Sequence, residues 1–210
     1  MPKPLVVVHV RTLPCNRKTG GSGIACTMVR AEPVVCWRTT PGGPLESEHL
    51  THTIPPTFDC CSRVLVLGSF PSPKSREYGF NYGHPQNRFW RVLASLADED
   101  VPMTVDERKD FCLRHGIALW DVVGECDIVG ASDTSIRNAR PNDLSLITRS
   151  APIEAVFCTG SKAHELYRRL GCEQMCGMAA VRLPSTSPAN AACGMDRLVE
   201  AYRQVFEHLT

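Results

Sequence analysis

The sequence of 210 residues lacks any apolar run that approaches the roughly 20 residues of a membrane-spanning helix. Its N-terminal apolar stretch, Leu5–Val8, is also shorter than the core of about 7–15 residues that a secretory signal peptide needs. We therefore expect an intracellular, cytoplasmic protein of bacterial type. The basic, acid-poor character of residues 1–45 leaves organelle targeting open as an alternative.

A strong charge of one sign is also absent. Residues 1–45 carry six Lys or Arg side chains against one Glu, so the rest of the chain holds 17 basic and 21 acidic side chains. This slightly acidic body does not favour nucleic-acid binding through bulk electrostatic attraction. Four basic residues, Lys74, Arg76, Arg88 and Arg91, lie near the loop described below and compensate only in part.

Several signatures of metal and nucleotide sites are missing. None of the eleven cysteines forms a C-x2-C pair, the spacing typical of a zinc ribbon. The stretch from Thr159 to Lys162 lacks the upstream glycine of a P-loop, and no G-x-S-x-G elbow of a serine hydrolase is present. We expect free thiols in a reducing compartment, with no metal and no cofactor.

Short apolar runs alternate with helical patterns along the chain. The expected strands are Val64–Leu67, Ile117–Val123, Ile153–Cys158 and Ala179–Leu183. The expected helices run from Asn87 to Leu96, from Val105 to His115 with Thr104 as N-cap, from Pro141 through Ile147, from Ser161 to Leu170 and from Met195 to Leu209. Residues 124–139 are expected to be a polar connection. The alternation predicts an α/β fold with a mostly parallel sheet that helices cover on both faces.

Composition divides the chain near residue 50. Residues 1–50 are basic and interrupted by six prolines and by glycine clusters, which predicts a flexible extension. Residues 51–210 are long enough for one domain with a sizeable core.

The loop after the first predicted strand holds the most chemical information. Gly68 and Pro71 end the strand, and the polar, aromatic-rich loop that follows leads into a helix at Asn87. Because ligands of open α/β sheets bind at the carboxyl ends of the strands, we expect the site here.

Three motifs carry a resemblance to a known family: GSFPS at 68–72, GF-x-YGHPQNRFW at 79–90 and LPSTSPANA at 183–191. Between about Ile54 and Leu209 the chain resembles the DNA-deoxyinosine (hypoxanthine-DNA) glycosylases, a branch of the uracil-DNA glycosylase superfamily. The resemblance implies a uracil-DNA-glycosylase-like three-layer sandwich with a four-stranded parallel sheet. It also implies a monomeric, metal-independent and monofunctional enzyme that removes deaminated bases, chiefly hypoxanthine, from DNA and leaves an abasic site.

The resemblance also assigns roles within the first two motifs. It implies that Asn87 is the catalytic amide and that Ser69, Phe70, Tyr82 and His84 form the base pocket. Asn suits this role because an amide positions water and hydrogen-bonds a purine edge without adding a charge. By residue type alone, Phe70 is a core residue, Tyr82 a brace for the loop and Asn87 the N-cap of the following helix; Asn87 could do both jobs.

The third motif is expected to bind DNA phosphates beside the extruded nucleotide. The residues implied are Ser185, Ser187, Pro188 and Asn190, because hydroxyls and free backbone amides before a helix suit anions. The alternative is a plain turn with a helix cap. Phe70 stands where many uracil enzymes have Asp, Asn or a small residue, and the resemblance to the hypoxanthine branch at this position favours a purine substrate. Ser185 stands where many uracil enzymes have histidine, which argues against uracil cleavage assisted by a cationic histidine.

Four alternatives remain open at this stage. A uracil-preferring enzyme, or one that accepts several deaminated bases, would share these motifs. A protein that binds damaged DNA without cutting it would share the fold. A hydrolase that uses Ser69 or Cys158 with His84 belongs to another class. Some related glycosylases carry an iron–sulfur cluster, for which Cys15, Cys26, Cys36 and Cys60 or Cys61 are the candidates, but the usual ligand spacing is absent.

Overall fold

The computed structural model describes residues 10–13, 26–29 and 47–209, the first two ranges as backbone only. Those two ranges are the strands β1 (Val10–Leu13) and β2 (Cys26–Val29), which pair antiparallel. Most of the predicted extension, residues 1–50, lies outside the described residues. The boundary expected between residues 50 and 51 falls within β3 (Glu48–Thr51), and the division into two parts stays a prediction.

Four parallel strands form the central sheet in the order β5-β4-β8-β9. They are β4 (Val64–Gly68), β5 (Ile117–Asp121), β8 (Ala155–Thr159) and β9 (Ala180–Leu183). Every residue of β4 and β5 is buried, as the unbroken apolar runs require of strands covered on both faces. The predicted parallel sheet is confirmed, and its carboxyl ends bring Gly68, Asp121 and Thr159 to one edge.

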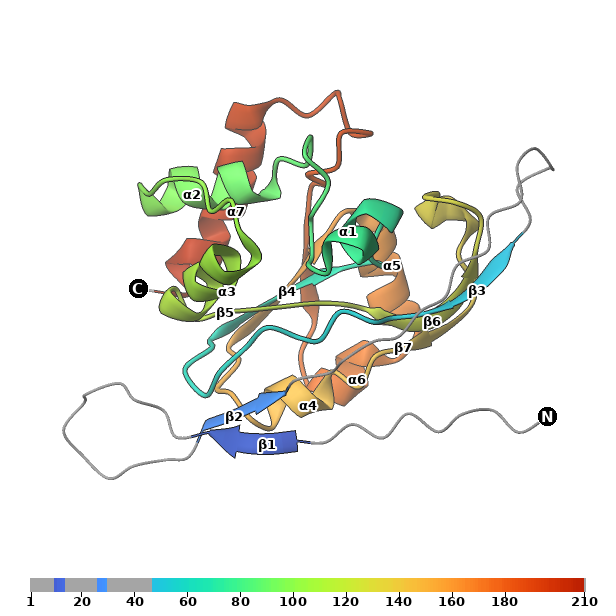
Figure 1. Cartoon of the computed structure of the whole chain (residues 1–210), viewed down its shortest axis with the longest axis horizontal. Coiled ribbons are helices and arrows are strands. Elements are labelled where there is room, and N and C mark those ends of the chain that lie inside the picture. The colour runs from blue at the N-terminus through green and yellow to red at the C-terminus, as the bar shows by residue number, and fades with distance from the viewer. Residues whose placement is uncertain (1–9, 14–25, 30–46, 210) are drawn as a thin grey trace.

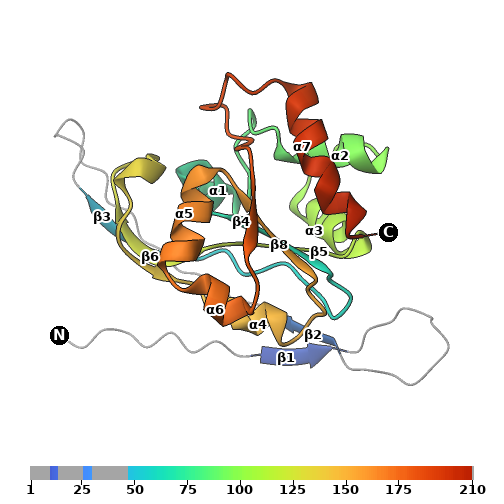
Figure 2. The ribbon, with the colours of Figure 1, turned by 180° about the vertical axis from the view of Figure 1, so that it is seen from behind.

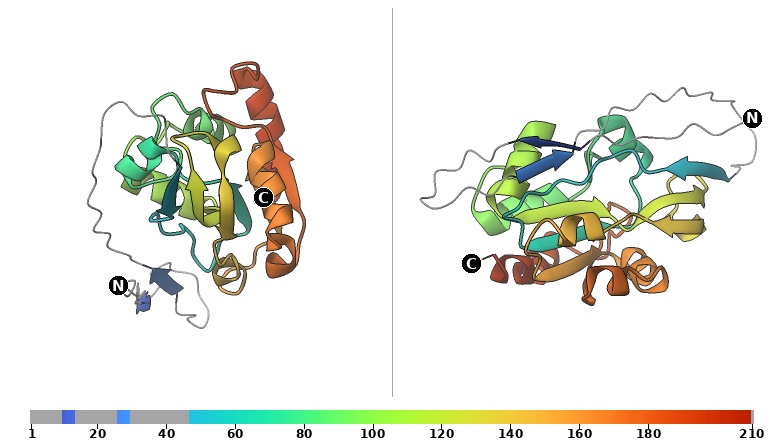
Figure 3. Two further views of the ribbon diagram at one scale, coloured as in Figure 1. Left: turned by 90° about the vertical axis from the view of Figure 1, so that its right-hand side faces the viewer. Right: turned by 90° about the horizontal axis from the view of Figure 1, so that it is seen from below.

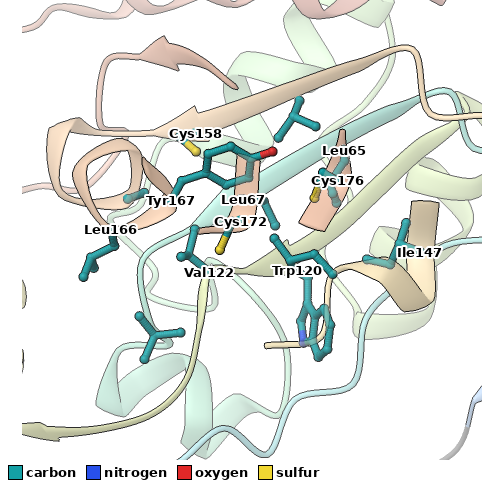
Figure 4. Packing of buried hydrophobic residues seen from close by; sticks show 14 of the residues in the cluster. Leu65, Leu67, Trp120, Val122, Ile147, Cys158, Leu166, Tyr167, Cys172 and Cys176 are labelled. Carbon is teal, nitrogen blue, oxygen red and sulfur yellow. The ribbon is translucent and has the colours of Figure 1, made fainter. Parts of the chain in front are cut away.

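Alternate residues of the strands point to two hydrophobic layers. On one face, Val64 and Val66 pack with α2 (Phe89–Ala97), α3 (Val105–Arg114) and α7 (Met195–Glu207). On the other face, Leu65 and Leu67 pack with α4 (Ser145–Thr148), α5 (Ser161–Arg169) and α6 (Cys172–Cys176), as Figure 4 shows for Tyr167. Figures 1 and 2 show the two helix layers on opposite sides of the sheet. The predicted α/β sandwich is therefore confirmed.

Residues 123–141 correct the sequence-based expectation. The chain turns directly from β5 into β6 (Val123–Ile128), returns as β7 (Arg137–Pro141) and pairs with β3 in an antiparallel sheet of order β3-β6-β7 (Figure 3). The expected polar connection at 124–139 is wrong, and so is the helix start at Pro141, since α4 begins at Ser145. The sequence gives little sign of this hairpin because β7 has no fully buried residue and the register between β6 and β7 is irregular.

Two further short elements bear on the site. The helix α1 (Pro73–Tyr78) lies inside the stretch that was expected to be all loop, and the side chain of Ser72 caps it by accepting a hydrogen bond from the backbone of Ser75. The short 3-10 helix η1 (Asp133–Ser135) forms the tip of the β6–β7 hairpin. Within the described ranges no helix is long and apolar enough to cross a membrane.

Candidate active site

A pocket of about 820 Å³ opens at the carboxyl ends of β4, β5 and β8. Seven of the nine predicted site residues line it: Ser69, Phe70, Tyr82, Asn87, Ser185, Ser187 and Asn190. His84 and Pro188 do not line it. His84 instead shapes the loop, because its Nδ1 accepts a hydrogen bond from the backbone of Gln86 over 3.1 Å. The pocket thus joins the three motifs although about 100 residues separate the second from the third.

Ser69 and Phe70 reach the pocket from the end of β4. The hydroxyl of Ser69 donates to Oδ2 of Asp133 at the tip of the β6–β7 hairpin. Burial raises the pKa of Asp133, and the negative charge of Asp121 raises it further. Phe70 belongs to the hydrophobic core as well as to the pocket wall, with only 6% of its surface exposed. The two descriptions of Phe70, as core residue and as pocket residue, are therefore compatible.

Tyr82 is held in a strained conformation at the pocket wall. Its φ is +54°, a region that non-glycine residues rarely adopt. Its ring stacks on Phe89 with centroids 3.8 Å apart, and its hydroxyl hydrogen-bonds Oγ1 of Thr159 over 2.7 Å. Burial raises the pKa of Tyr82 well above its ordinary value, so the hydroxyl is neutral. The ring braces the loop against α2 and β8 while one side of the residue lines the pocket.

Asn87 is both a helix-start residue and a pocket residue. Its Oδ1 accepts a hydrogen bond from the backbone N–H of Phe89 over 3.0 Å, the kind of contact by which asparagine satisfies the first turn of a helix. This contact fixes the amide orientation. Nδ2 donates to no described residue and is left available to a group in the pocket. The helix α2 begins at Phe89 with Arg88 as its N-cap, so the expected helix start and N-cap at Asn87 are wrong by one or two residues, although the Asn87 side chain still binds the first helical N–H. The catalytic role of Asn87 stays a prediction.

The guanidinium of Arg88 connects the second and third motifs. It donates to the carbonyl oxygens of Ser187 over 3.0 Å, of Asn190 over 2.9 Å and of Cys193, and its Nε lies 3.4 Å from the oxygen of Thr186. The backbone N–H of Arg88 also donates to Thr186. Arg88 is therefore engaged with main-chain carbonyls of the third motif.

Side chains of the third motif also organise their own backbone. Nδ2 of Asn190 donates to the carbonyl of Ser185 over 2.8 Å, and the Ser185 hydroxyl accepts from the N–H of Ser187. The Ser187 hydroxyl accepts from the N–H of Ala189, and Pro188 is exposed at the turn. Both hydroxyls accept these hydrogen bonds and keep their own O–H groups for donation. The plain turn that was expected as the alternative is therefore present, and it still offers hydrogen-bond donors to a ligand in the pocket.

A buried polar cluster of three residues was not among the predicted site residues: Asn81 and Asp121 line the pocket, and His52 contacts Asp121 without lining it. Oδ2 of Asp121 accepts from Nδ2 of Asn81 over 2.6 Å and contacts Nε2 of His52 at 2.8 Å. All three side chains are almost fully buried. Asp121 gave one signal, since a carboxylate at the end of an apolar strand is costly unless it is paired. His52 gave none, because it precedes Asp121 by 69 residues.

Neither Ser69 nor Cys158, the two candidate nucleophiles, makes the hydrogen bond to His84 that a serine or cysteine hydrolase would need. Burial raises the pKa of the Cys158 thiol far above its ordinary value, so this sulfur is a poor nucleophile. The hydroxyl of Ser69 donates to Asp133, and His84 does not line the pocket. In the described ranges no three His, Cys, Asp or Glu side chains gather where they could hold a metal ion.

The polar pocket lies at the carboxyl edge of a four-stranded parallel sheet, which is where α/β proteins bind their ligands. Comparison with known proteins gives the family. Residues 55–209 match the uracil DNA glycosylase superfamily, and the chain belongs to it. The resemblance noted from the three motifs is confirmed.

Two curated relatives are named hypoxanthine DNA glycosylase. The one from Methanosarcina acetivorans is 33% identical over 159 residues, which cover 73% of this chain and 96% of the relative. The one from Methanosarcina barkeri is 35% identical over 124 residues, covering 57% and 78%. A solution NMR structure from Methanosarcina acetivorans, provisionally assigned as a uracil DNA glycosylase, matches with a TM-score of 0.65 at 30% identity and covers 76% of this chain and 98% of that one. These relationships support a DNA glycosylase role with DNA as the substrate.

Proposed function

We propose that this protein is a monofunctional DNA glycosylase that hydrolyses the N-glycosidic bond of deoxyinosine, releases hypoxanthine and leaves an abasic site. The main support for the proposal is that all three motifs line one pocket. The guanidinium of Arg88, in the second motif, holds the third motif beside the first two through hydrogen bonds to the carbonyls of Ser187 and Asn190. The names of the relatives at 33% and 35% identity favour hypoxanthine among the deaminated bases. A cytoplasmic monomer that acts without metal or cofactor is part of the same proposal.

The reaction requires the target nucleotide to leave the duplex and enter the pocket. The oxygen of a water molecule then forms a bond to C1′ while the C1′–N9 bond breaks, and the electron pair stays on N9 of the departing base. The water loses one proton to the solvent and the base takes one up, so the products are hypoxanthine and an abasic sugar with a hydroxyl at C1′. Asn87 is assigned the catalytic role because its orientation is fixed by Phe89 and its Nδ2 remains available in the pocket. Phe70 and Tyr82 would lie against the base, and Ser185, Ser187 and Asn190 beside the phosphates.

A labelled duplex with one deoxyinosine, incubated with the protein and then cleaved with alkali at abasic sites, tests the proposal. A matched duplex with one deoxyuridine runs in parallel. We expect cleavage at inosine above uracil, lost in Asn87→Ala and retained in the neighbouring control Gln86→Ala, whose side chain is exposed outside the pocket. Preferred cleavage at uracil would make the protein a uracil-preferring enzyme. Binding without cleavage of either duplex would refute the catalytic proposal.

A further inference from the structure

The pocket contains few groups that accept a proton from water. Among the described residues that line it, the carboxylates are those of Asp121 and Asp133, and no histidine or glutamate lies there. The amide of Asn87 orients a water molecule but does not take its proton. The phenol of Tyr82 is neutral, because burial raises its pKa well above the ordinary value. A group that takes a proton from water in this pocket is therefore one of the two aspartates.

The two aspartates differ in their surroundings. Asp121 is only 4% exposed, and its Oδ2 already contacts both Asn81 and His52. Asp133, at the tip of the β6–β7 hairpin, is half-buried and receives one hydrogen bond, from Ser69. Asp133 therefore reaches both the pocket and the solvent, to which a base must return its proton after each turnover.

The hairpin tip that carries Asp133 is held in place by its neighbours. The hydroxyl of Ser135 accepts a hydrogen bond from the N–H of Val129 over 2.8 Å and donates to the carbonyl of Ser132 over 2.6 Å. Ile136, the residue after η1, is 1% exposed and packs into the hydrophobic core. The backbone at Asp133 is therefore fixed on both sides, as a preorganised catalytic group requires.

Ser69 fixes the orientation of the Asp133 carboxylate. Its hydroxyl donates to Oδ2, and its own carbonyl accepts a hydrogen bond from the N–H of Val123 over 3.0 Å, so that Ser69 is anchored at the end of β4. Oδ1 of Asp133 accepts no hydrogen bond from the described part of the chain. Because Ser69 occupies Oδ2, Oδ1 is the oxygen that is left to accept a proton from a water molecule in the pocket.

The environment of Asp133 strengthens it as a base. Burial raises its pKa, and the negative charge of Asp121 on β5 raises it further, while Lys162 on α5 lowers it. Two other groups lie near the hairpin tip. Cys126 on β6 is a neutral thiol, because burial raises its pKa to about 11, and Arg137 on β7 donates to backbone carbonyls. A carboxyl whose pKa is raised toward the working pH is a more effective general base than an ordinary one.

We propose that Asp133 is the general base of the hydrolysis, with Ser69 as the positioning residue that orients its carboxylate. Oδ1 of Asp133 takes one proton from the attacking water while the water oxygen forms its bond to C1′ and the C1′–N9 electron pair stays on N9. The other hydrogen of the water remains in the new C1′ hydroxyl. Asp133 then releases its proton to the solvent, from which the departing base takes one up. The inference rests on the proposed glycosylase function and adds the group that activates the water.

The substitution Asp133→Asn tests the proposal with little change in shape. The amide oxygen of the new side chain still accepts the hydrogen bond from Ser69, but the amide takes no proton from water. Asp133→Glu keeps a carboxylate at the same position. Asp106→Asn, on an exposed residue of α3, controls for the loss of one carboxyl group.

The measurement is single-turnover cleavage of the inosine duplex at a series of pH values, with each protein in saturating excess. Asp133→Asn should cleave about a hundredfold or more slowly than wild type on the alkaline side of the series. The ratio of the two rates should shrink as the pH falls through the raised pKa of Asp133, because a protonated carboxyl is no base. Affinity for a duplex with a 2′-fluoro-arabino inosine, which resists cleavage, should stay within about twofold of wild type, because the base acts in the transition state.

The other variants have distinct expected results. Asp133→Glu should recover part of the rate, and its ratio to wild type should change little with pH. Asp106→Asn should match wild type throughout. Urea denaturation confirms that each variant is folded. If Asp133→Asn does not fold, Asp133→Glu decides, since a rate that no longer falls with pH as the wild-type rate does would contradict a carboxylate base at this position.

Cleavage by Asp133→Asn at the wild-type rate would overturn the inference. So would a slower rate whose ratio to wild type is the same at every pH, because a merely structural role lowers the rate and the affinity without regard to protonation. Either result with an active wild type refutes only the role of Asp133. A wild type that cleaves neither the inosine nor the uracil duplex refutes the glycosylase proposal, and the inference with it.

Discussion

Arg88 donates from its guanidinium to the carbonyl oxygen of Asn190 across 2.9 Å, although 102 residues separate them in the sequence. With the further contacts to Ser187 and Cys193, one side chain sets the position of the third motif relative to the catalytic loop. The geometry of the pocket therefore depends on a residue that need not touch the substrate.

Replacing Arg88 by lysine should lower inosine cleavage about tenfold to a hundredfold, because lysine lacks the planar fork that spans several carbonyls. Loss of these hydrogen bonds should also cost about 1–3 kcal/mol of unfolding free energy. Single-turnover cleavage and urea denaturation measure the two effects. Arg149→Lys, on the exposed end of α4, is the matched control. Wild-type activity in Arg88→Lys would contradict the role of Arg88.

Asn87→Asp separates the helix-start role of Asn87 from its catalytic role. Aspartate keeps an acceptor for the N–H of Phe89, so the unfolding free energy should stay within a few tenths of a kcal/mol of wild type. The Nδ2 donor is lost, and inosine cleavage should fall by about two orders of magnitude. Asn87→Ala should lose both cleavage and about 1 kcal/mol of stability. Equal activity in Asn87→Asp and wild type would show that Asn87 only begins the helix.

Gly68→Ala should both destabilise the protein and abolish activity. The new methyl group meets Oδ1 of Asp121 at 2.2 Å in a fully buried strand, and overpacking of this kind costs typically about 1–3 kcal/mol. Thermal melting and inosine cleavage measure the two losses. Gly194→Ala is the control, because its φ is −66° and nothing lies within 4 Å of the added carbon. A Gly68→Ala protein with normal cleavage would mean that the base does not approach this wall.

Asp133 should make the stability of the protein depend on pH. Its folded-state pKa lies above the ordinary value of 3.8, chiefly because burial disfavours the charged form. Between 3.8 and the raised value the folded protein therefore binds more protons than the unfolded chain, and stability falls as the pH rises through that window. Asp133→Asn should remove this loss, which urea denaturation at a series of pH values would show. Asp106→Asn on α3 controls for the removal of one carboxyl group. Parallel curves for Asp133→Asn and wild type would contradict the prediction.

The strands β4, β5 and β8 were predictable because each is built on an apolar run that a doubly covered strand buries, whereas β9 is shorter and half exposed. The helix start at Thr104 was also predictable, since its capping box is a local pattern that the structure confirms. The β6–β7 hairpin was not, because its strands bury few side chains and are defined by pairing with β3. Its tip nevertheless brings Asp133 to the pocket.

The sequence by itself determined the parallel sheet, the family and the three motifs that line the pocket, because apolar runs, caps and motif spacing are local properties of the chain. The tertiary structure alone decided the partners of the polar groups. His52, Asn81 and Asp121 meet at one carboxylate oxygen only after three segments pack together. Arg88 binds carbonyl groups, and since every residue has a carbonyl, no sequence pattern marks the ones it contacts.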